Sequence, residues 1–287
     1  GMTFDYSTAI ESNQNIITIN SAASDVTVRG CGFTLGELSD VNQPNCIAIN
    51  EASGTTIENN KFHLTRIAGQ SVVAINLSGA KADNTTVSGN SFDVTGNAET
   101  NTLLFFLKAM GEALSAGTTA SDYIEGLHIT ENTINGSGAD TVASFAGIAG
   151  VKEPVITGNT VNDCCVGIAK VTWGNNAADN NLTGSTTISG NTYTGMTNDT
   201  YITLAKAARK SGNVWTDYNS VQNAVDDIHP GDTVVGRPTS ADNANDVTVT
   251  LDYNDGVSEN ATIILIKDTS VKLPTPTRSG YTFQGWY

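Results

Sequence analysis

The sequence predicts an all-β protein in which a parallel β-helix of about six coils is followed by a small β-rich module. Three observations lead to this fold class. A short asparagine-centred unit recurs along much of the chain. Charged residues make up only 15% of it, and the abundant Asn, Thr, Ser, Gly and Ala suit stacked strands and tight turns better than helices. The repeat ends near residue 205, and from Val247 a strictly alternating strand pattern follows.

The repeated unit reads apolar–x–x–Asn–x–apolar. Ile or Val stands three positions before the asparagine, and Phe, Ile, Val or Tyr stands two positions after it. Successive asparagines are 30, 42, 27 and 32 residues apart. A repeat of this length predicts a solenoid, in which each coil buries its apolar positions against its neighbours. The five asparagines are Asn60, Asn90, Asn132, Asn159 and Asn191.

Each asparagine is expected at an inward-facing corner of its coil. Because a buried polar group must be hydrogen-bonded, its amide would donate to one neighbouring coil and accept from the other, which builds a ladder. A Gly or Asn just before it permits the left-handed backbone of such a corner. A degenerate earlier copy carries Cys31 instead of asparagine. The 42-residue interval holds an insertion around 108–114, and we expect the 95–127 region to emerge as a loop or short helix.

These units, with the Gly-Ile pairs at 147–148 and 167–168, resemble the repeats of the pectin-lyase-like superfamily over about residues 15–205. The resemblance implies a right-handed β-helix, which we assign to residues 1–205. It says little about activity, because that superfamily contains lyases, hydrolases, epimerases, adhesins and inert spacers.

Residues 206–245 are predicted to form a helix-containing cap or bridge. Apolar residues at helical spacing predict one amphipathic helix over 218–228, with Asp217 as its N-cap, and Asp232–Val235 then reads as a strand. The segment resembles the opening cap of pectin-lyase-like β-helices, but it follows the coils. We therefore expect it to close the open edge of the last coil.

Residues 246–287 are predicted to form a separate module. Val247–Tyr253 alternates apolar and polar residues, a turn follows, and Ala261–Lys267 gives a second strand. The ending Gly-Tyr-x-Phe-x-Gly-Trp-Tyr at 280–287 resembles the Listeria–Bacteroides repeat, also called the internalin-type B repeat. This resemblance implies a β-grasp-like unit of bacterial surface proteins. Its aromatic side chains, expected to form the core of the unit, are Tyr281, Phe283 and Trp286.

The charge of the chain argues against nucleic-acid and membrane partners, and its cysteine content argues against a disulfide scaffold. The chain carries 29 acidic and 14 basic residues, a net charge of −15, which would repel nucleic acid and an anionic membrane surface. No apolar run is long enough for a membrane span, and the four cysteines are too few for a disulfide scaffold. We expect a monomer without a cofactor. Whether Ca²⁺ binds among the Asp- and Asn-rich turns near 242–246 stays open.

The aligned repeat places outward side chains of equal offset in rows. β-Helix lyases need clustered carboxylates for Ca²⁺ and a basic residue, and hydrolases need paired carboxylates. No row beside the asparagines holds two carboxylates. Most members are Ser and Thr, which suit exposed strands and could also lie against a polysaccharide or ice. The rows are Glu58, Ser88, Thr130, Thr157 and Ser189; Lys61, Ser91, Thr133, Thr160 and Thr192; and His63, Asp93, Asn135, Asn162 and Thr194.

The best catalytic candidate is the corner where His63 should stack beside Asp93, with Glu58, Lys61 and Arg66 nearby. An imidazole beside a carboxylate is a usable base, although an ordinary solvated face would show the same residues. A second polar row, able to contact sugar, is expected on another wall of the solenoid. Its members are Asn50, Asn76 and Lys108.

These features favour an extracellular bacterial cell-surface module that presents a β-helix to a polysaccharide or host-surface glycan without catalysis. The first alternative is a polysaccharide lyase or glycoside hydrolase, whose site would lie between the 95–127 insertion and the corner of His63 and Asp93. The second alternative is an inert surface spacer.

Overall fold

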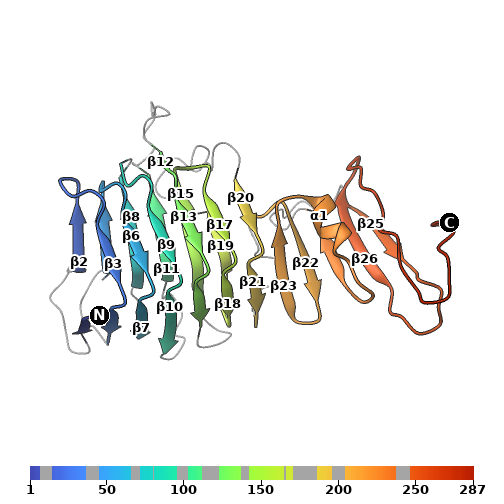
Figure 1. Cartoon of the computed structure of the whole chain (residues 1–287), viewed down its shortest axis with the longest axis horizontal. Coiled ribbons are helices and arrows are strands. Elements are labelled where there is room, and N and C mark those ends of the chain that lie inside the picture. The colour runs from blue at the N-terminus through green and yellow to red at the C-terminus, as the bar shows by residue number, and fades with distance from the viewer. Residues whose placement is uncertain are drawn as a thin grey trace.

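The computed structural model describes residues 1–6, 15–36, 45–65, 72–79, 81–95, 103–111, 123–136, 142–164, 166–170, 186–195, 204–236 and 246–287. The molecule is elongated, with the two termini at opposite ends of its long axis and the strands of successive coils side by side between them (Figure 1). In this part of the chain, no helix is long and apolar enough to cross a membrane.

Six coils form a β-solenoid, and each coil contributes one strand to each of three sheets, while sheet A begins with one further strand, β1 (Thr3–Tyr6). The prediction of a parallel β-helix of about six coils is therefore confirmed. Sheet B contains β2 (Asn15–Asn20), β5 (Asn45–Asn50), β8 (Val72–Ser78), β11 (Leu103–Met110), β15 (Val142–Ala149) and β19 (Val166–Lys170). Sheet C contains β3 (Thr27–Arg29), β6 (Thr56–Glu58), β9 (Thr86–Ser88), β13 (His128–Thr130), β17 (Val155–Thr157) and β20 (Thr187–Ser189).

Sheet A begins as a parallel sheet that lies across the asparagine corner from sheet C. Its solenoid strands are β1 (Thr3–Tyr6), β4 (Gly32–Leu35), β7 (Lys61–Thr65), β10 (Ser91–Thr95), β14 (Thr133–Asn135), β18 (Thr160–Asn162) and β21 (Thr192–Thr194). A short pair, β12 (Ile124–Glu125) with β16 (Val151–Lys152), adds a parallel contact between two coils. Equal positions of the repeat pair across the sheet, so that Phe62 pairs with Phe33 on one side and Phe92 on the other.

Inward side chains of the coils fill the solenoid with one apolar core. In β7, Phe62 and Leu64 are buried while Lys61 and His63 are exposed, as the alternation of a strand requires. Neighbouring rings stack along sheet A from Phe4 through Phe33 and Phe62 to Phe92, with interplanar angles of 10°, 9° and 4°. Sheet B does not show this alternation, because consecutive residues on both faces of β5 and β8 are buried.

The asparagines form one buried column between sheets C and A, and each is 1% exposed or less. The side-chain Nδ2 of each donates to the Oδ1 of the next. The distances are 3.0 Å from Asn60 to Asn90, 3.0 Å from Asn90 to Asn132, 2.9 Å from Asn132 to Asn159 and 2.7 Å from Asn159 to Asn191.

Each link of the column is reinforced by the backbone. The backbone N–H of Asn132 also donates to Asn159 Oδ1 at 2.9 Å, and Asn159 Nδ2 also donates to the carbonyl of Ile129 at 2.9 Å. At the N-terminal end, the backbone N–H of Cys31 donates to Asn60 Oδ1 at 2.9 Å, so the cysteine copy is joined to the column through its backbone.

The residue before each column position adopts the left-handed backbone that the sequence predicts. The φ angles run from 54° to 68° at Gly30, Asn59, Gly89, Glu131, Gly158 and Gly190. Glu131 is the unusual member, because this region costs a residue other than Gly, Asn or Asp about 1–2 kcal/mol.

Replacing Glu131 with glycine should therefore stabilise the protein by about 0.5–1 kcal/mol, after the entropy cost of the glycine is subtracted. The midpoint of urea unfolding measures the change. Glu131→Ala is the control, since it removes the same charge but keeps a Cβ. An equal gain from alanine would assign the effect to charge rather than to the backbone.

The asparagine column ends at Asp217, which lies in β23 (Val214–Tyr218). Asn191 Nδ2 donates to the two carboxylate oxygens at 3.2 and 3.0 Å, and the backbone N–H of Asn191 donates to Asp217 Oδ1 at 2.9 Å. The prediction of Asp217 as a helix N-cap is therefore wrong, because the residue is extended and buried. Helix α1 (Val221–Asp226) begins later, and its N-cap is Ser220, whose Oγ accepts from the Asn223 N–H at 3.1 Å.

Sheet A continues past the solenoid into the C-terminal part. Beyond β21 the strand order is β23, β22 (Ala207–Ser211), β24 (Thr233–Val235), β26 (Ala261–Ile266) and β25 (Asp246–Leu251). The predicted strand after the helix is thus present as β24. A second core joins α1 to these strands, with Ala224 and Val225 packed near Val234 and Ile263. One sheet and one core therefore cross the predicted boundary at residue 245.

Part of the predicted insertion belongs to a regular strand. Lys108–Met110 lie at the end of β11, in register with β8 and β15. The expected loop or short helix does not include these residues, because they continue a buried wall of the coil. Residues 96–102 and 112–122 of the predicted insertion lie outside the described part of the chain.

Candidate functional site

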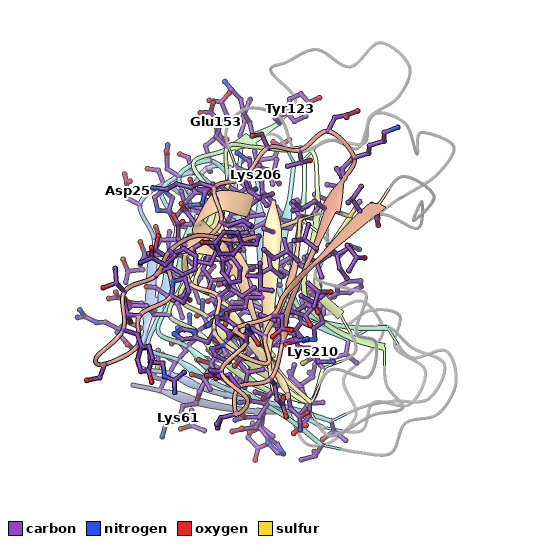
Figure 2. All side chains as sticks on the ribbon, turned by 90° about the vertical axis from the view of Figure 1, so that its right-hand side faces the viewer. Asp25, Lys61, Tyr123, Glu153, Lys206 and Lys210 are labelled. Carbon is purple, nitrogen blue, oxygen red and sulfur yellow. The ribbon has the colours of Figure 1, made fainter. Side chains whose placement is uncertain are left out.

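Outward side chains of sheets A and C form a continuous polar surface around the asparagine corner. Strand β10 shows the pattern, with Phe92 and Val94 buried and Ser91, Asp93 and Thr95 facing solvent. Figure 2 looks along the long axis from the C-terminal end and shows the labelled Lys61 at the outer rim of the solenoid. Apart from the hydrogen-bonded asparagine column, the inward positions of these sheets are mainly apolar, so a ligand would meet this outer surface.

The last three coils carry nine uncharged hydroxyl and amide side chains on this surface, which we name the hydroxyl–amide grid. Cross-strand pairing aligns them in three rows, and none of the nine is buried. The charged residues Glu131 and Asp163 adjoin it at turns. The rows are Thr130, Thr157 and Ser189; Thr133, Thr160 and Thr192; and Asn135, Asn162 and Thr194.

The outermost row of the grid is held by its own hydrogen bonds. Asn135 Nδ2 donates to Asp93 Oδ1 at 2.9 Å, Asn162 Nδ2 donates to Asn135 Oδ1 at 3.1 Å, and Thr194 Oγ1 donates to Asn162 Oδ1. Neighbours across strands are spaced by about 4.8 Å, and outward neighbours along one strand by about 6.6 Å. The grid therefore presents donors and acceptors at regular and restricted positions.

The corner of His63 and Asp93 is assembled in register, since their Cα atoms are paired between β7 and β10. Their hydrogen bonds nevertheless go elsewhere. His63 Nε2 lies 3.5 Å from Thr95 Oγ1, and Asp93 accepts from Asn135. Within the described part of the chain, no hydrogen bond or ion pair joins the imidazole of His63 to a carboxylate.

The other predicted members of this corner are spread around it. Glu58 lies on sheet C and forms an ion pair with Arg29 at 3.5 Å. Lys61 lies on sheet A, in register with Gly32 and Ser91. Arg66 falls outside the described residues. The structure thus places Glu58 and Lys61 on different sheets, and within the described part of the chain neither forms a hydrogen bond or ion pair with His63.

Among the described residues, no group of three or more His, Cys, Asp or Glu side chains is arranged to hold a metal ion. The Asp- and Asn-rich stretch near 242–246 lies outside that part of the chain, apart from Asp246. The hydroxyl–amide grid itself offers hydroxyl and amide groups. Such groups can bind a polar polymer through many weak hydrogen bonds.

The expected row of Asn50, Asn76 and Lys108 is wrong in its alignment. Asn76 pairs with Lys108, but Asn50 is two positions further along and pairs with Ser78. The repeat could not reveal this offset, because the buried residues of sheet B do not alternate with exposed ones. Lys108 is only 7% exposed, and burial lowers the pKa of its ammonium group.

Three side-chain hydrogen bonds on sheet B were not predicted. Asn50 Nδ2 donates to Asn20 Oδ1 at 3.3 Å, and Ser78 Oγ donates to Asn50 Oδ1 at 2.9 Å, which forms a second short ladder. Asn45 Nδ2 donates to Asn15 Oδ1 at 2.7 Å. The 30-residue spacing of the asparagine pairs 15/45 and 20/50 was the available signal.

The sequence analysis did not predict a charged cluster that lies in the C-terminal part of the chain. Arg209 Nη1 donates to the buried carboxylate of Asp232 at 3.1 Å and lies 2.9 Å from His229 Nδ1. Its Nη2 lies 3.1 Å from Asp227 Oδ2, and Tyr218 donates a hydrogen bond to the same carboxylate. Burial and Asp227 raise the pKa of Tyr218 to about 12. This cluster ties β22 to the end of α1.

The aromatic residues near the C-terminus divide into two kinds. Trp286 packs against the second core and its Nε1 donates to the Pro274 carbonyl at 2.8 Å, while the ring of Phe283 contacts it edge to face. Tyr281 is 68% exposed and lies under the guanidinium of Arg278, with 4.3 Å from Cζ to the ring centroid. The prediction of Tyr281 as a core residue is therefore wrong.

Comparison of the chain with known protein families, curated proteins and solved structures found no match.

Proposed function

We propose that this chain is a bacterial cell-surface module that attaches to a polysaccharide or host-surface glycan through its β-solenoid, without catalysis. The observation that carries this proposal is the hydroxyl–amide grid. Its nine side chains are solvent-accessible, uncharged and aligned by parallel strand pairing. A sugar polymer offers hydroxyls at regular intervals, so a lattice of fixed donors and acceptors can engage several sugars at once.

The net charge of the chain limits the class of glycan that it can bind. A net charge of −15 repels sulfated, phosphorylated and uronate-rich polymers unless a basic patch overcomes it. The grid itself contains no basic side chain, so neutral glycans fit it best.

The hydrogen bonds of His63 and Asp93 argue against the enzyme alternative. A polysaccharide lyase or hydrolase needs an oriented base or a pair of carboxylates. Here the imidazole faces Thr95 and the Asp93 carboxylate is occupied by Asn135.

The rest of the proposal concerns architecture and location. We infer a right-handed solenoid of the pectin-lyase-like kind, a C-terminal unit of the Listeria–Bacteroides type with β-grasp character, and an extracellular location. The asparagine-centred repeats and the ending at 280–287 support this assignment. In keeping with it, we infer a monomer that binds neither nucleic acid nor a membrane.

Replacing Thr133, Thr160 and Thr192 together with alanine should weaken binding to the best neutral glycan at least tenfold. The central row would lose three hydroxyls while every buried residue stays in place. A glycan array identifies the ligand, and titration calorimetry measures the affinity. The control variant replaces Thr27, Thr56 and Thr86, an equally aligned threonine row on sheet C, and should bind normally.

An activity assay on the unmodified protein distinguishes the glycan-binding module from the enzyme and spacer alternatives. Incubation with uronate and neutral glycans would release unsaturated or reducing ends if the protein were an enzyme, and His63→Ala would abolish that release. Such a result would overturn the non-catalytic proposal. An array without any bound glycan would favour the spacer.

A further inference from the structure

Asp217 lies at the joint between the solenoid and the C-terminal strands. Its strand β23 pairs antiparallel with β21, the last solenoid strand of sheet A. The backbone N–H of Asp217 donates to the carbonyl of Asn191 at 3.2 Å, and its own carbonyl accepts from the N–H of Gly190 at 2.9 Å. The side chain is 0% exposed. Separation of β23 from β21 would therefore bring this carboxyl into contact with water.

Among the residues that the structure describes, the hydrogen-bond partners of the Asp217 carboxyl are all neutral donors. The backbone N–H and Nδ2 of Asn191 supply donors at 2.9 to 3.2 Å, and the hydroxyl of Tyr193 donates to Oδ2 at 3.0 Å. Among the described residues, no basic side chain forms an ion pair with Asp217. A buried carboxylate without a cation is costly to ionise.

The charged groups on neighbouring elements are directed to other partners. Arg209 on β22 binds Asp227 and Asp232, and the Nζ of Lys210 lies 5.4 Å from the ring centroid of Trp215. Strand β20 carries no titratable residue. The titratable or charged groups on the elements around Asp217 are Tyr193 on β21, Arg209 and Lys210 on β22, Tyr218 on β23 and Asp226 on α1.

We propose that Asp217 is an acid-responsive latch, which holds the C-terminal strands to the solenoid more tightly when its carboxyl is protonated than when it is ionised. The end of the asparagine column suits this role. An asparagine there would need an acceptor for its own amide, whereas a carboxyl accepts from Asn191 in both protonation states. The Tyr193 hydroxyl donates to the ionised carboxylate, and its oxygen can accept a hydrogen bond from the protonated carboxyl.

The direction of the response follows from burial. Burial raises the pKa of the Asp217 carboxyl from 3.8 to about 6, against the hydrogen bonds of Asn191 and Tyr193, which lower it. The closed joint thus holds this proton more tightly than the opened joint. The added stability is fully present below pH 3.8 and is lost as the pH rises through about 6.

Hydrogen exchange of the full chain tests the latch. The exchange protection of the Gly190 and Asn191 amides, corrected for intrinsic rates, should fall roughly 100-fold between pH 4 and pH 8. In Asp217→Asn the protection should vary little with pH, because the isosteric amide does not titrate. Equal pH profiles in the two proteins, or a flat profile in the unmodified chain, would overturn the proposal.

Two further variants sharpen the test. Asp232→Asn removes another buried carboxylate, but one that binds Arg209, and it should keep the pH profile of the unmodified chain. Tyr193→Phe removes a hydrogen bond that favours the ionised carboxyl, so the midpoint of the profile should move to higher pH. This shift tests the latch even if Asp217→Asn does not fold. A Tyr193→Phe midpoint that stays in place or moves to lower pH would contradict the latch.

Discussion

Replacing Asn159 with alanine is expected to lower the free energy of unfolding by roughly 3–5 kcal/mol, because several buried polar groups lose their partners together and each costs about 1–3 kcal/mol. Asn159 Oδ1 accepts from both the backbone N–H and the Nδ2 of Asn132. Its Nδ2 donates to the Ile129 carbonyl and to Asn191 Oδ1. The residue is 0% exposed, so water does not reach these groups in the folded protein. Urea unfolding followed by circular dichroism measures the loss.

Asn162→Ala is the matched control for this substitution. Asn162 is also a laddered asparagine, three residues further along the chain, and its Nδ2 donates to Asn135 Oδ1 at 3.1 Å. Because it faces solvent, water replaces the lost bonds, and the expected cost is below about 1 kcal/mol. Equal losses in the two variants would show that burial of the column does not govern its contribution.

Replacing Phe62 with alanine should cost about 3–5 kcal/mol of unfolding free energy, the range for removal of a fully buried aromatic ring. The ring of Phe62 stacks between Phe33 at 4.9 Å and Phe92 at 4.4 Å between centroids, and it is 1% exposed. Alanine would leave a void in the middle of this stack, since the neighbouring coils are held apart by strand pairing. The same urea experiment measures the change.

Phe62→Leu is the control for ring removal. Leucine keeps much of the buried volume, so its cost should be smaller than that of alanine by at least about 1 kcal/mol. Losses of equal size from leucine and alanine would mean that ring stacking, rather than filled volume, stabilises this row.

Much of the solenoid could be predicted from the repeat, because its physical requirements are periodic. A coil can stack only if its inward positions are apolar, and the positions around Asn60 and Asn90 meet that condition at equal offsets. The left-handed residue before each asparagine followed from the same unit. The cross-strand pairing of His63 with Asp93 on sheet A followed as well, since exposed and buried positions alternate there.

The candidate site was less predictable, because hydrogen-bond partners depend on distances that a repeat does not specify. Register predicts that His63 and Asp93 are neighbours, but only side-chain geometry shows that each binds a different partner. The only sequence feature that could have identified Asp217 as the end of the asparagine column was its spacing. It lies 26 residues after Asn191, close to the shortest interval between column asparagines, which is 27. A helix-like pattern just downstream hid that signal, because an aspartate before an apolar stripe also suits an N-cap.

What the sequence determined by itself is the coiled architecture and its buried amide column, because both arise from short-range patterns repeated at each coil. Tertiary structure decided where the column ends, how sheet B is aligned and how the C-terminal strands join the solenoid. These features depend on single contacts, such as that of Asn191 with Asp217, between segments that share no repeated pattern. A contact of that kind is stabilised by burial and geometry together, and neither can be read from residue spacing alone.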